Sequence, residues 1–86
     1  MNDSVDRIEQ DYFDGVNNLK MVMIEGGSIA FFLNDLLHRE DGPAFISEFP
    51  LIEAEYYLWG DKYDTMPNKA EIEKMRKEIA IEDILL

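Results

Sequence analysis

The sequence predicts an α+β fold: a small antiparallel sheet of β-hairpins with about four or five strands, a short N-terminal helix, and a C-terminal helix packed on the sheet. Three observations support this prediction. Apolar runs alternate with turn-forming residues through the middle of the chain, residues 38–44 (HREDGPA) place Asp-Gly-Pro between two such runs, and a capped amphipathic pattern follows. With 86 residues, the chain is expected to form a single domain, 1–86.

Residues 1–14 predict an acidic N-terminal helix or arm. Val5, Ile8 and Tyr12 lie at helical spacing, with Phe13 as a further candidate, and Asn2 or Asp3 is available as a cap. The same residues contain five acids against one arginine, so this arm is expected to present a negative surface.

Residues 16–64 predict the β-hairpin region. A weakly alternating apolar run at residues 19–24 ends in Glu25-Gly26-Gly27-Ser28, and the two glycines allow the positive φ of a hairpin turn. Residues 29–33 are then expected to form the returning strand.

The segment 28–37 admits a second assignment. Its apolar residues recur at positions 29, 32, 33, 36 and 37, which is the spacing of one helical face. An internal similarity favours strands instead, because residues 31–38 align with residues 56–63: two aromatics, a leucine, then a turn-compatible pair. The fold prediction adopts the aromatic strand, tight turn and short return strand, while the periodicity leaves a helix open.

Residues 31–46 resemble small bacterial and phage proteins built from the repeat aromatic-aromatic-x-Asn-Gly-x-x-His-Arg-x-Asp-Gly-Pro-Ala, which is similar in style to the membrane-occupation-and-recognition-nexus (MORN) hairpins. Asn34-Asp35 stands where Asn-Gly is usual, and residues 56–63 look like a final repeat without the second half of the motif. The matching residues are His38, Arg39, Asp41, Gly42, Pro43 and Ala44. The resemblance implies β-hairpins and a phage or prophage accessory protein.

Residues 38–44 are expected to act as a structural turn. Asp41 can accept backbone N–H groups, Gly42 can adopt the left-handed conformation, and Pro43 fixes φ. Arg39 can reach Asp41 or Glu40, and His38 can donate to a strand carbonyl. A catalytic role for His38 is disfavoured, because the chain has no cysteine and no marked nucleophile, so the protein is predicted not to be an enzyme.

No cofactor or metal is expected. The acid pairs Asp11 with Asp14 and Glu53 with Glu55 supply oxygen ligands, but no calcium-binding loop can be placed around them. No glycine-rich phosphate loop is present either.

Residues 67–86 predict a C-terminal helix with an apolar tail. Asn68 and Glu71 form a capping pair, and Ile72, Met75 and Ile79 form one apolar stripe. The tail at residues 81–86 is expected to dock on the core, with a partner contact as the alternative.

The composition favours a protein partner with a basic surface. Nineteen acids against eight bases give a net charge of −11, which repels nucleic acid and speeds encounter with basic proteins. No signal segment or run long enough to span a bilayer is evident, so a cytoplasmic location is expected, the host cytoplasm if the protein is phage-encoded.

The function predicted is that of a non-enzymatic acidic interaction protein. We expect a phage or prophage accessory factor that binds and inhibits or modulates a basic host protein, and DNA mimicry follows if that protein binds nucleic acid. The alternative is a structural hairpin-repeat module that self-associates into a homo-oligomer. The residues predicted to contact the partner are Glu53, Glu55, Tyr57, Trp59, Asp61 and Asp64. Alternation would place Tyr57 and Trp59 on one face.

Overall fold

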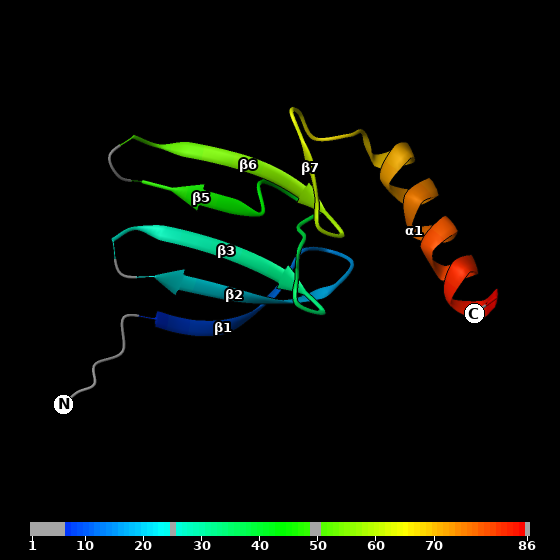
Figure 1. Ribbon diagram of the computed structural model, residues 1–86, viewed down its shortest axis with the longest axis horizontal. Coiled ribbons are helices and arrows are strands. Elements are labelled where there is room, and N and C mark those ends of the chain that lie inside the picture. The colour runs from blue at the N-terminus through cyan, green and yellow to red at the C-terminus, as the bar shows by residue number, and fades with distance from the viewer. Residues whose placement is uncertain (1–6, 25, 49–50, 86) are drawn as a thin grey trace.

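The computed structural model describes residues 7–24, 26–48 and 51–85, and these form an antiparallel sheet followed by one helix (Figure 1). The α+β class is therefore confirmed, and the strands outnumber the four or five predicted. The elements in chain order are β1 (Arg7–Phe13), β2 (Asn18–Ile24), β3 (Ser28–Leu33), β4 (Leu36–Leu37), β5 (Phe45–Ser47), β6 (Glu53–Leu58), β7 (Asp61–Tyr63) and α1 (Lys69–Leu85). The sheet order is β1-β2-β3-β5-β6-β7, and β4 pairs with β3.

The predicted N-terminal helix is wrong, because residues 7–13 form the edge strand β1. The whole of β1 pairs with β2, from Arg7 opposite Ile24 to Phe13 opposite Asn18. The Tyr12 ring then packs edge-on against Phe31 of β3, with ring centroids 4.9 Å apart. Long-range pairing has overridden a helical spacing that only three residues supported. The predicted cap and Val5 lie outside the described residues.

The strand assignment for residues 28–37 is correct, and the helix is excluded. β2 and β3 form the expected hairpin, with Ile24 opposite Ser28. Gly26 and Gly27 have φ of 105° and 99°, the left-handed region that only glycine adopts at little cost. A side chain at Gly27 would in addition meet the Cβ of Glu48 at 3.3 Å.

The internal similarity corresponds to two hairpins with the same geometry. Both turns have positive φ at both central residues, 51° and 69° at Asn34-Asp35 and 50° and 87° at Trp59-Gly60. This is the type I′ pattern that suits a two-residue hairpin loop. The pairing register also corresponds, because Phe32 lies opposite Leu37 just as Tyr57 lies opposite Lys62. The β3-β4 and β6-β7 hairpins are therefore structural equivalents.

β4 and β5 lie along the same edge of β3, separated by the loop 39–43. The His38 N–H donates to the Phe31 carbonyl at 3.0 Å, and the Phe31 N–H donates to the Ala44 carbonyl at 2.8 Å. On the other side, the Ala44 N–H donates to the Glu55 carbonyl of β6 at 2.9 Å. The two short strands thus form one interrupted strand between β3 and β6, from which the loop projects.

The loop 39–43 is organised by the Arg39 side chain. The guanidinium carbon lies 4.3 Å from the Phe31 ring centroid, and its nitrogens donate to Asp41 at 2.6 Å, Pro43 O at 3.2 Å and the Tyr12 hydroxyl at 3.0 Å. The predicted contact between Arg39 and Asp41 is confirmed.

Gly42 serves a different purpose from the one predicted. Its φ is not positive, so it is not a left-handed turn residue. A Cβ at Gly42 would instead lie 3.1 Å from the Arg39 guanidinium carbon, inside normal contact distance. Asp41 also differs from the prediction, because it accepts from the Arg39 and Tyr12 side chains. A side chain at Gly42 would therefore crowd the Arg39 guanidinium where it packs across the turn.

The sheet is a single layer with one charged and one apolar face. Directly opposed residues share a face, so the register assigns each strand residue to one side. The charged face contains Glu9, Asp11, Lys20, Glu53, Glu55 and Lys62, together with the apolar residues Val22, Ala30, Phe32 and Phe45. The apolar face contains Ile8, Met21, Met23, Ile29, Phe31, Ile46, Ala54, Tyr56 and Leu58. Of the described strand residues, only Asp61 brings a charge to the apolar face.

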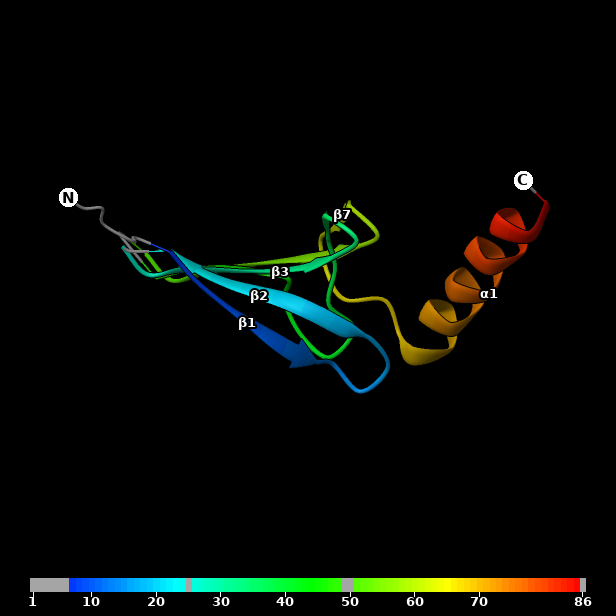
Figure 2. The same cartoon turned by 90° about the horizontal axis from the view of Figure 1, so that it is seen from below.

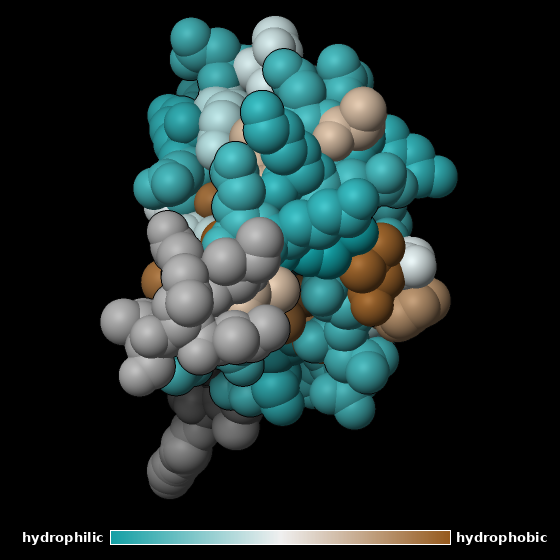
Figure 3. All heavy atoms as spheres, turned by 90° about the vertical axis from the view of Figure 1, so that its right-hand side faces the viewer, coloured by the Kyte–Doolittle hydropathy of each residue, from teal (hydrophilic) through white to brown (hydrophobic). Residues whose placement is uncertain are grey.

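Helix α1 lies beyond one end of the sheet rather than over a face, which corrects the predicted packing (Figure 2). The predicted capping pair is present: the Glu71 N–H donates to Asn68 at 2.8 Å, and the Asn68 N–H donates to Glu71 at 3.1 Å. Ile72 is buried, and the Tyr63 hydroxyl contacts the Met75 sulfur at 3.8 Å. The helix end of the molecule presents mainly hydrophilic residues (Figure 3).

The helix extends to Leu85 and so includes most of the predicted apolar tail, whose side chains lie outside those that the structure describes. No helix in the described ranges is long and apolar enough to cross a membrane.

Candidate functional site

Three of the six predicted partner-binding residues share one surface. Glu53, Glu55 and Tyr57 alternate along β6 and lie on the charged face. The Tyr57 hydroxyl donates to Glu55 Oε1 at 3.0 Å, and Lys62 of β7 lies 3.4 Å from Glu55 Oε2. This set of Glu53, Glu55 and Tyr57 is called the β6 acidic patch below.

The other three predicted residues lie elsewhere. Trp59 is in the turn with φ of 50°, so it does not continue the alternation of β6 as predicted. Its ring packs on His38 with centroids 4.5 Å apart, and the residue is half-buried. Asp61 begins β7 opposite Leu58, on the apolar face, and the exposed Asp64 follows that strand.

Tyr57 stays a neutral hydrogen-bond donor. Its hydrogen bond to Glu55 is the main cause that raises the pKa of the phenol above 10.0. In the acidic patch, Glu55 therefore already has two partners, whereas Glu53, at the start of β6, is exposed to solvent.

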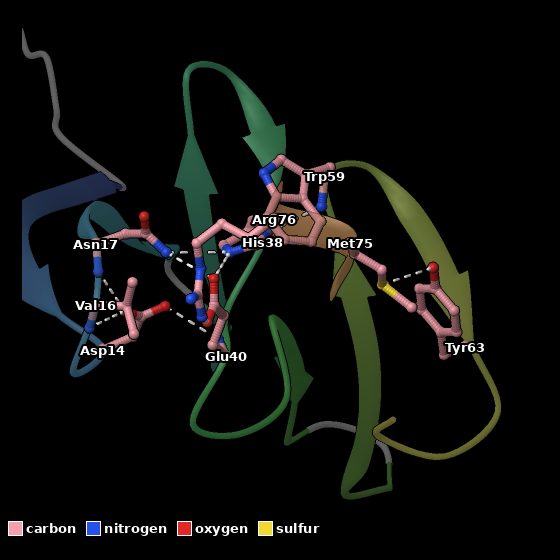
Figure 4. Close-up of polar contacts among 9 residues, drawn as sticks. All are labelled: Asp14, Val16, Asn17, His38, Glu40, Trp59, Tyr63, Met75 and Arg76. Carbon is pink, nitrogen blue, oxygen red and sulfur yellow. Dashed lines mark hydrogen bonds and ion pairs between the residues drawn. The ribbon is translucent and has the colours of Figure 1, made fainter. Parts of the chain in front are cut away.

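A buried polar network beside the turn 14–17 was not predicted (Figure 4). His38 is completely buried and the Glu40 side chain is 6% exposed. Glu40 Oε2 lies 3.1 Å from His38 Nε2 and accepts from Asn17 Nδ2 at 2.9 Å, while Glu40 Oε1 accepts from Arg76 of α1 at 2.5 Å. The network joins the first hairpin, the loop after β4 and the helix.

Asp14 holds the turn of the first hairpin in place. Its Oδ1 accepts the backbone N–H groups of Val16 and Asn17 at 3.0 and 2.7 Å, and its Oδ2 accepts the backbone N–H of Glu40 at 3.0 Å. Burial alone would raise the pKa of Asp14, but these three backbone donors outweigh it and lower the pKa below 3.8.

The geometry fixes the tautomer of His38. The Trp59 backbone N–H points at His38 Nδ1 at 2.9 Å, so Nδ1 must be the unprotonated acceptor. Nε2 then carries the proton and donates it to Glu40, rather than to the strand carbonyl predicted from the sequence. The 3.3 Å approach of Asn17 Nδ2 to Nε2 is a contact between two donors that share the Glu40 oxygen.

Neither a metal nor general-base catalysis fits this arrangement. The oxygens of Asp14 and Glu40 and a ring nitrogen of His38 lie within 4.8 Å of one another, a spacing compatible with a metal ion. However, the only lone pair of a neutral imidazole is already used by the Trp59 N–H. Arg76 also supplies Glu40 with a positive partner. The same occupied lone pair leaves His38 without a free base nitrogen.

The network should make stability depend on pH. Burial is the main cause that lowers the pKa of His38 below 6.5, and the carboxylate of Glu40 opposes it only in part. Below pH 6.5 the unfolded chain binds a proton at His38 that the folded chain does not bind. The contribution of His38 to the free energy of unfolding is therefore fully present above pH 6.5 and decreases as the pH falls below it. Asp14 adds a second loss as the pH falls through 3.8 and below.

We expect the urea midpoint to decrease between about pH 8 and pH 5 in the intact protein. In a His38→Asn variant the decrease over this interval should be clearly smaller, since asparagine does not titrate. An equal decrease in both proteins would assign the effect to other groups.

Comparison with protein-family models, with curated proteins and with solved structures finds no match for this chain. The repeat family named from residues 31–46 therefore stays a resemblance.

Proposed function

We propose that this protein is a non-enzymatic interaction protein that binds a basic partner protein through the β6 acidic patch. The observation that carries the proposal is the segregation of charge. Apart from Asp61, the charges of the described strand residues lie on one face, and the patch places Glu53 and Glu55 beside the aromatic Tyr57 on that face. Tyrosine beside exposed carboxylates suits recognition of lysine and arginine side chains. The net charge of −11 adds long-range attraction to such a partner.

The proposed partner is a protein rather than a nucleic acid, because phosphates would be repelled by the same charge. A nucleic-acid-binding protein is the most suitable kind of basic partner, since its binding surface already accepts closely spaced negative groups. Occupation of that surface would inhibit it. The further proposal of a phage or prophage role is supported by the resemblance of residues 31–46 alone.

Charge reversal of the predicted site tests the proposal. A variant with Glu53 and Glu55 replaced by lysine should lose capture of the basic partner from a lysate of the cells that carry the protein, with recovery reduced roughly tenfold or more. Quantitative mass spectrometry of the captured proteins provides the measurement, and circular dichroism verifies that the variant is folded.

A matched control separates the local patch from the overall charge. Its two replacements by lysine are at other exposed acids, Glu48 and Glu78. Each replacement adds two positive charges, so both variants change the net charge from −11 to −7. The control should retain most of the capture. Equal loss in both variants, or no loss in either, would contradict a site on β6.

Self-association is the second candidate. It is supported by the single-layer sheet, in which Ile8 is 57% exposed on the apolar face and no second layer of described residues covers the sheet (Figure 2). Sedimentation velocity at tens of micromolar separates the two candidates, because a strict monomer would remove this one.

A further inference from the structure

The two equivalent hairpins differ in what lies along their outer edge. In the first, β5 continues along β3 after the loop, with Ser28, Ile29 and Ala30 opposite Ser47, Ile46 and Phe45. The equivalent residues of the second hairpin are Glu53, Ala54 and Glu55 of β6. On the β7 side, β6 is paired only at residues 56–58, and no described strand takes the place that β5 takes on β3 (Figure 1).

The backbone of Ala54 faces this open position. The carbonyl of Glu55 points towards β5, since it accepts the Ala44 N–H, and successive backbone groups of a strand point in opposite directions. The N–H and C=O of Ala54 therefore point away from β5, past the end of β7. Leu51 and Ile52, which come just before β6 in the chain, are 67% and 82% exposed.

We propose that this edge binds an extended segment of the partner by β-strand addition, and that the segment carries basic residues at alternating positions. The inference rests on the proposed function for the charge of the partner. The added strand would take the place on β6 that β5 occupies on β3, with its backbone bonded to Ala54. Its residues opposite Glu53 and Glu55 lie two apart and project to the charged face, about 5 Å from the glutamates.

Charge decides between a partner segment and a second copy of this chain. If two copies joined through this edge in antiparallel fashion about Ala54, each Glu53 would face a Glu55 of the other copy, and directly opposed like charges destabilise a strand pair. The other free edge, β1, places Glu9 and Asp11 on the charged face and would repel the patch in the same way. The acids thus disfavour self-pairing and favour a basic strand.

A peptide probe tests the mode of binding. The acetylated and amidated peptide Thr-Lys-Val-Lys-Val-Lys-Thr presents lysines at alternating positions, and Thr-Val-Lys-Lys-Lys-Val-Thr has the same composition without the alternation. We expect the first to bind at least tenfold more tightly when measured by NMR titration. We further expect it to slow hydrogen exchange at the Ala54 amide at least tenfold, because that amide gains a hydrogen-bond acceptor.

The Ala54→Pro variant removes the outward N–H without disturbing the pairing of β6 with β5, since proline is tolerated where the N–H faces away from the ladder. It should weaken binding of the alternating peptide at least tenfold, while the control Ala54→Ser, which keeps the N–H, should bind within twofold of the original. If Ala54→Pro does not fold, the peptide with N-methylated valines replaces it, because that peptide cannot form the same ladder.

The outcomes distinguish this inference from the proposed function. Peptide binding that leaves the Ala54 amide unprotected, or that survives Ala54→Pro, would overturn strand addition even if the charge-reversed β6 variant still loses its partner. Equal binding of the two peptides would also overturn it. If charge reversal does not reduce capture but the alternating peptide still protects the Ala54 amide from exchange, the proposal of a basic partner protein would be contradicted. The edge of β6 would then remain a strand-binding site.

Discussion

Replacing His38 by alanine is expected to lower the free energy of unfolding by about 3–4 kcal/mol. The substitution removes a side chain that is completely buried against Trp59, and it leaves the Trp59 N–H without its acceptor. For a domain of this size, such a loss lowers the melting temperature by roughly 15 °C or more. Thermal and urea unfolding followed by circular dichroism measure it.

Two shape-matched variants separate the contributions at this position. His38→Asn places a carbonyl oxygen close to the position of Nδ1, so it can retain the bond from Trp59 and lose the bond to Glu40. His38→Gln can retain the bond to Glu40 and lose the bond from Trp59. Both should be more stable than His38→Ala. If alanine costs less than about 1 kcal/mol, the network is not a main source of stability.

Replacing Arg76 by methionine should cause the second largest decrease in the free energy of unfolding, about 2–4 kcal/mol. The guanidinium is the only cation bonded to Glu40 among the described residues, and that carboxylate is nearly buried. The hydrogen bond to Glu40 raises the pKa of the Arg76 guanidinium above its ordinary value, so Arg76 carries its positive charge at neutral pH. Methionine preserves much of the aliphatic stem and isolates the effect of the charge.

Lys77→Met provides the control, because Lys77 is an exposed neighbour on the same helix. It should change stability by no more than about 0.5 kcal/mol. Since the Arg76 bond ties α1 to the loop after β4, Arg76→Met should also increase hydrogen exchange in the first turns of the helix. Equal stability of the two variants would show that the helix is held by apolar contacts such as that of Ile72.

The hairpins were predictable because their signals are local. Two glycines between apolar runs, and the recurrence of an aromatic strand before a turn-forming pair, directly determine a turn and its flanking strands. The recurrence also resolved the helical spacing of residues 28–37 correctly. The capping pair of Asn68 and Glu71 is local in the same sense, and it predicted the start of α1.

The errors arise where distant residues decide the structure. β1 is a strand because β2 lies beside it, and a spacing argument over residues 2–13 has no access to that pairing. The place of α1 depends on Arg76 reaching Glu40, 36 positions earlier in the chain, and nothing in the sequence distinguishes Arg76 from the other basic residues of the helix.

The site was predicted only in part for the same reason. The prediction that alternation places Tyr57 and Trp59 on one face was wrong, because a turn with positive φ takes Trp59 out of the alternation of β6 and packs its ring on His38. For the buried network, one local signal was available. Asp14-Gly15, followed two residues later by Asn17, is typical of a turn in which the aspartate accepts backbone N–H groups. This pattern would identify Asp14 as a structural acid rather than a solvated one.

The buried network has a consequence for the order of folding. Apart from the local bond between His38 and Glu40, its bonds from Asn17, Trp59 and Arg76 join residues 21 to 36 positions apart, whereas each hairpin with a two-residue loop closes locally. Loop-closure entropy favours local pairs early, so we expect the hairpins to form first and the contacts of His38 and Glu40 to form only when four separate parts of the chain have met. Interactions made after the transition state act on the unfolding rate. The network therefore governs how long the native state lasts once it is formed, more than how quickly the chain reaches it.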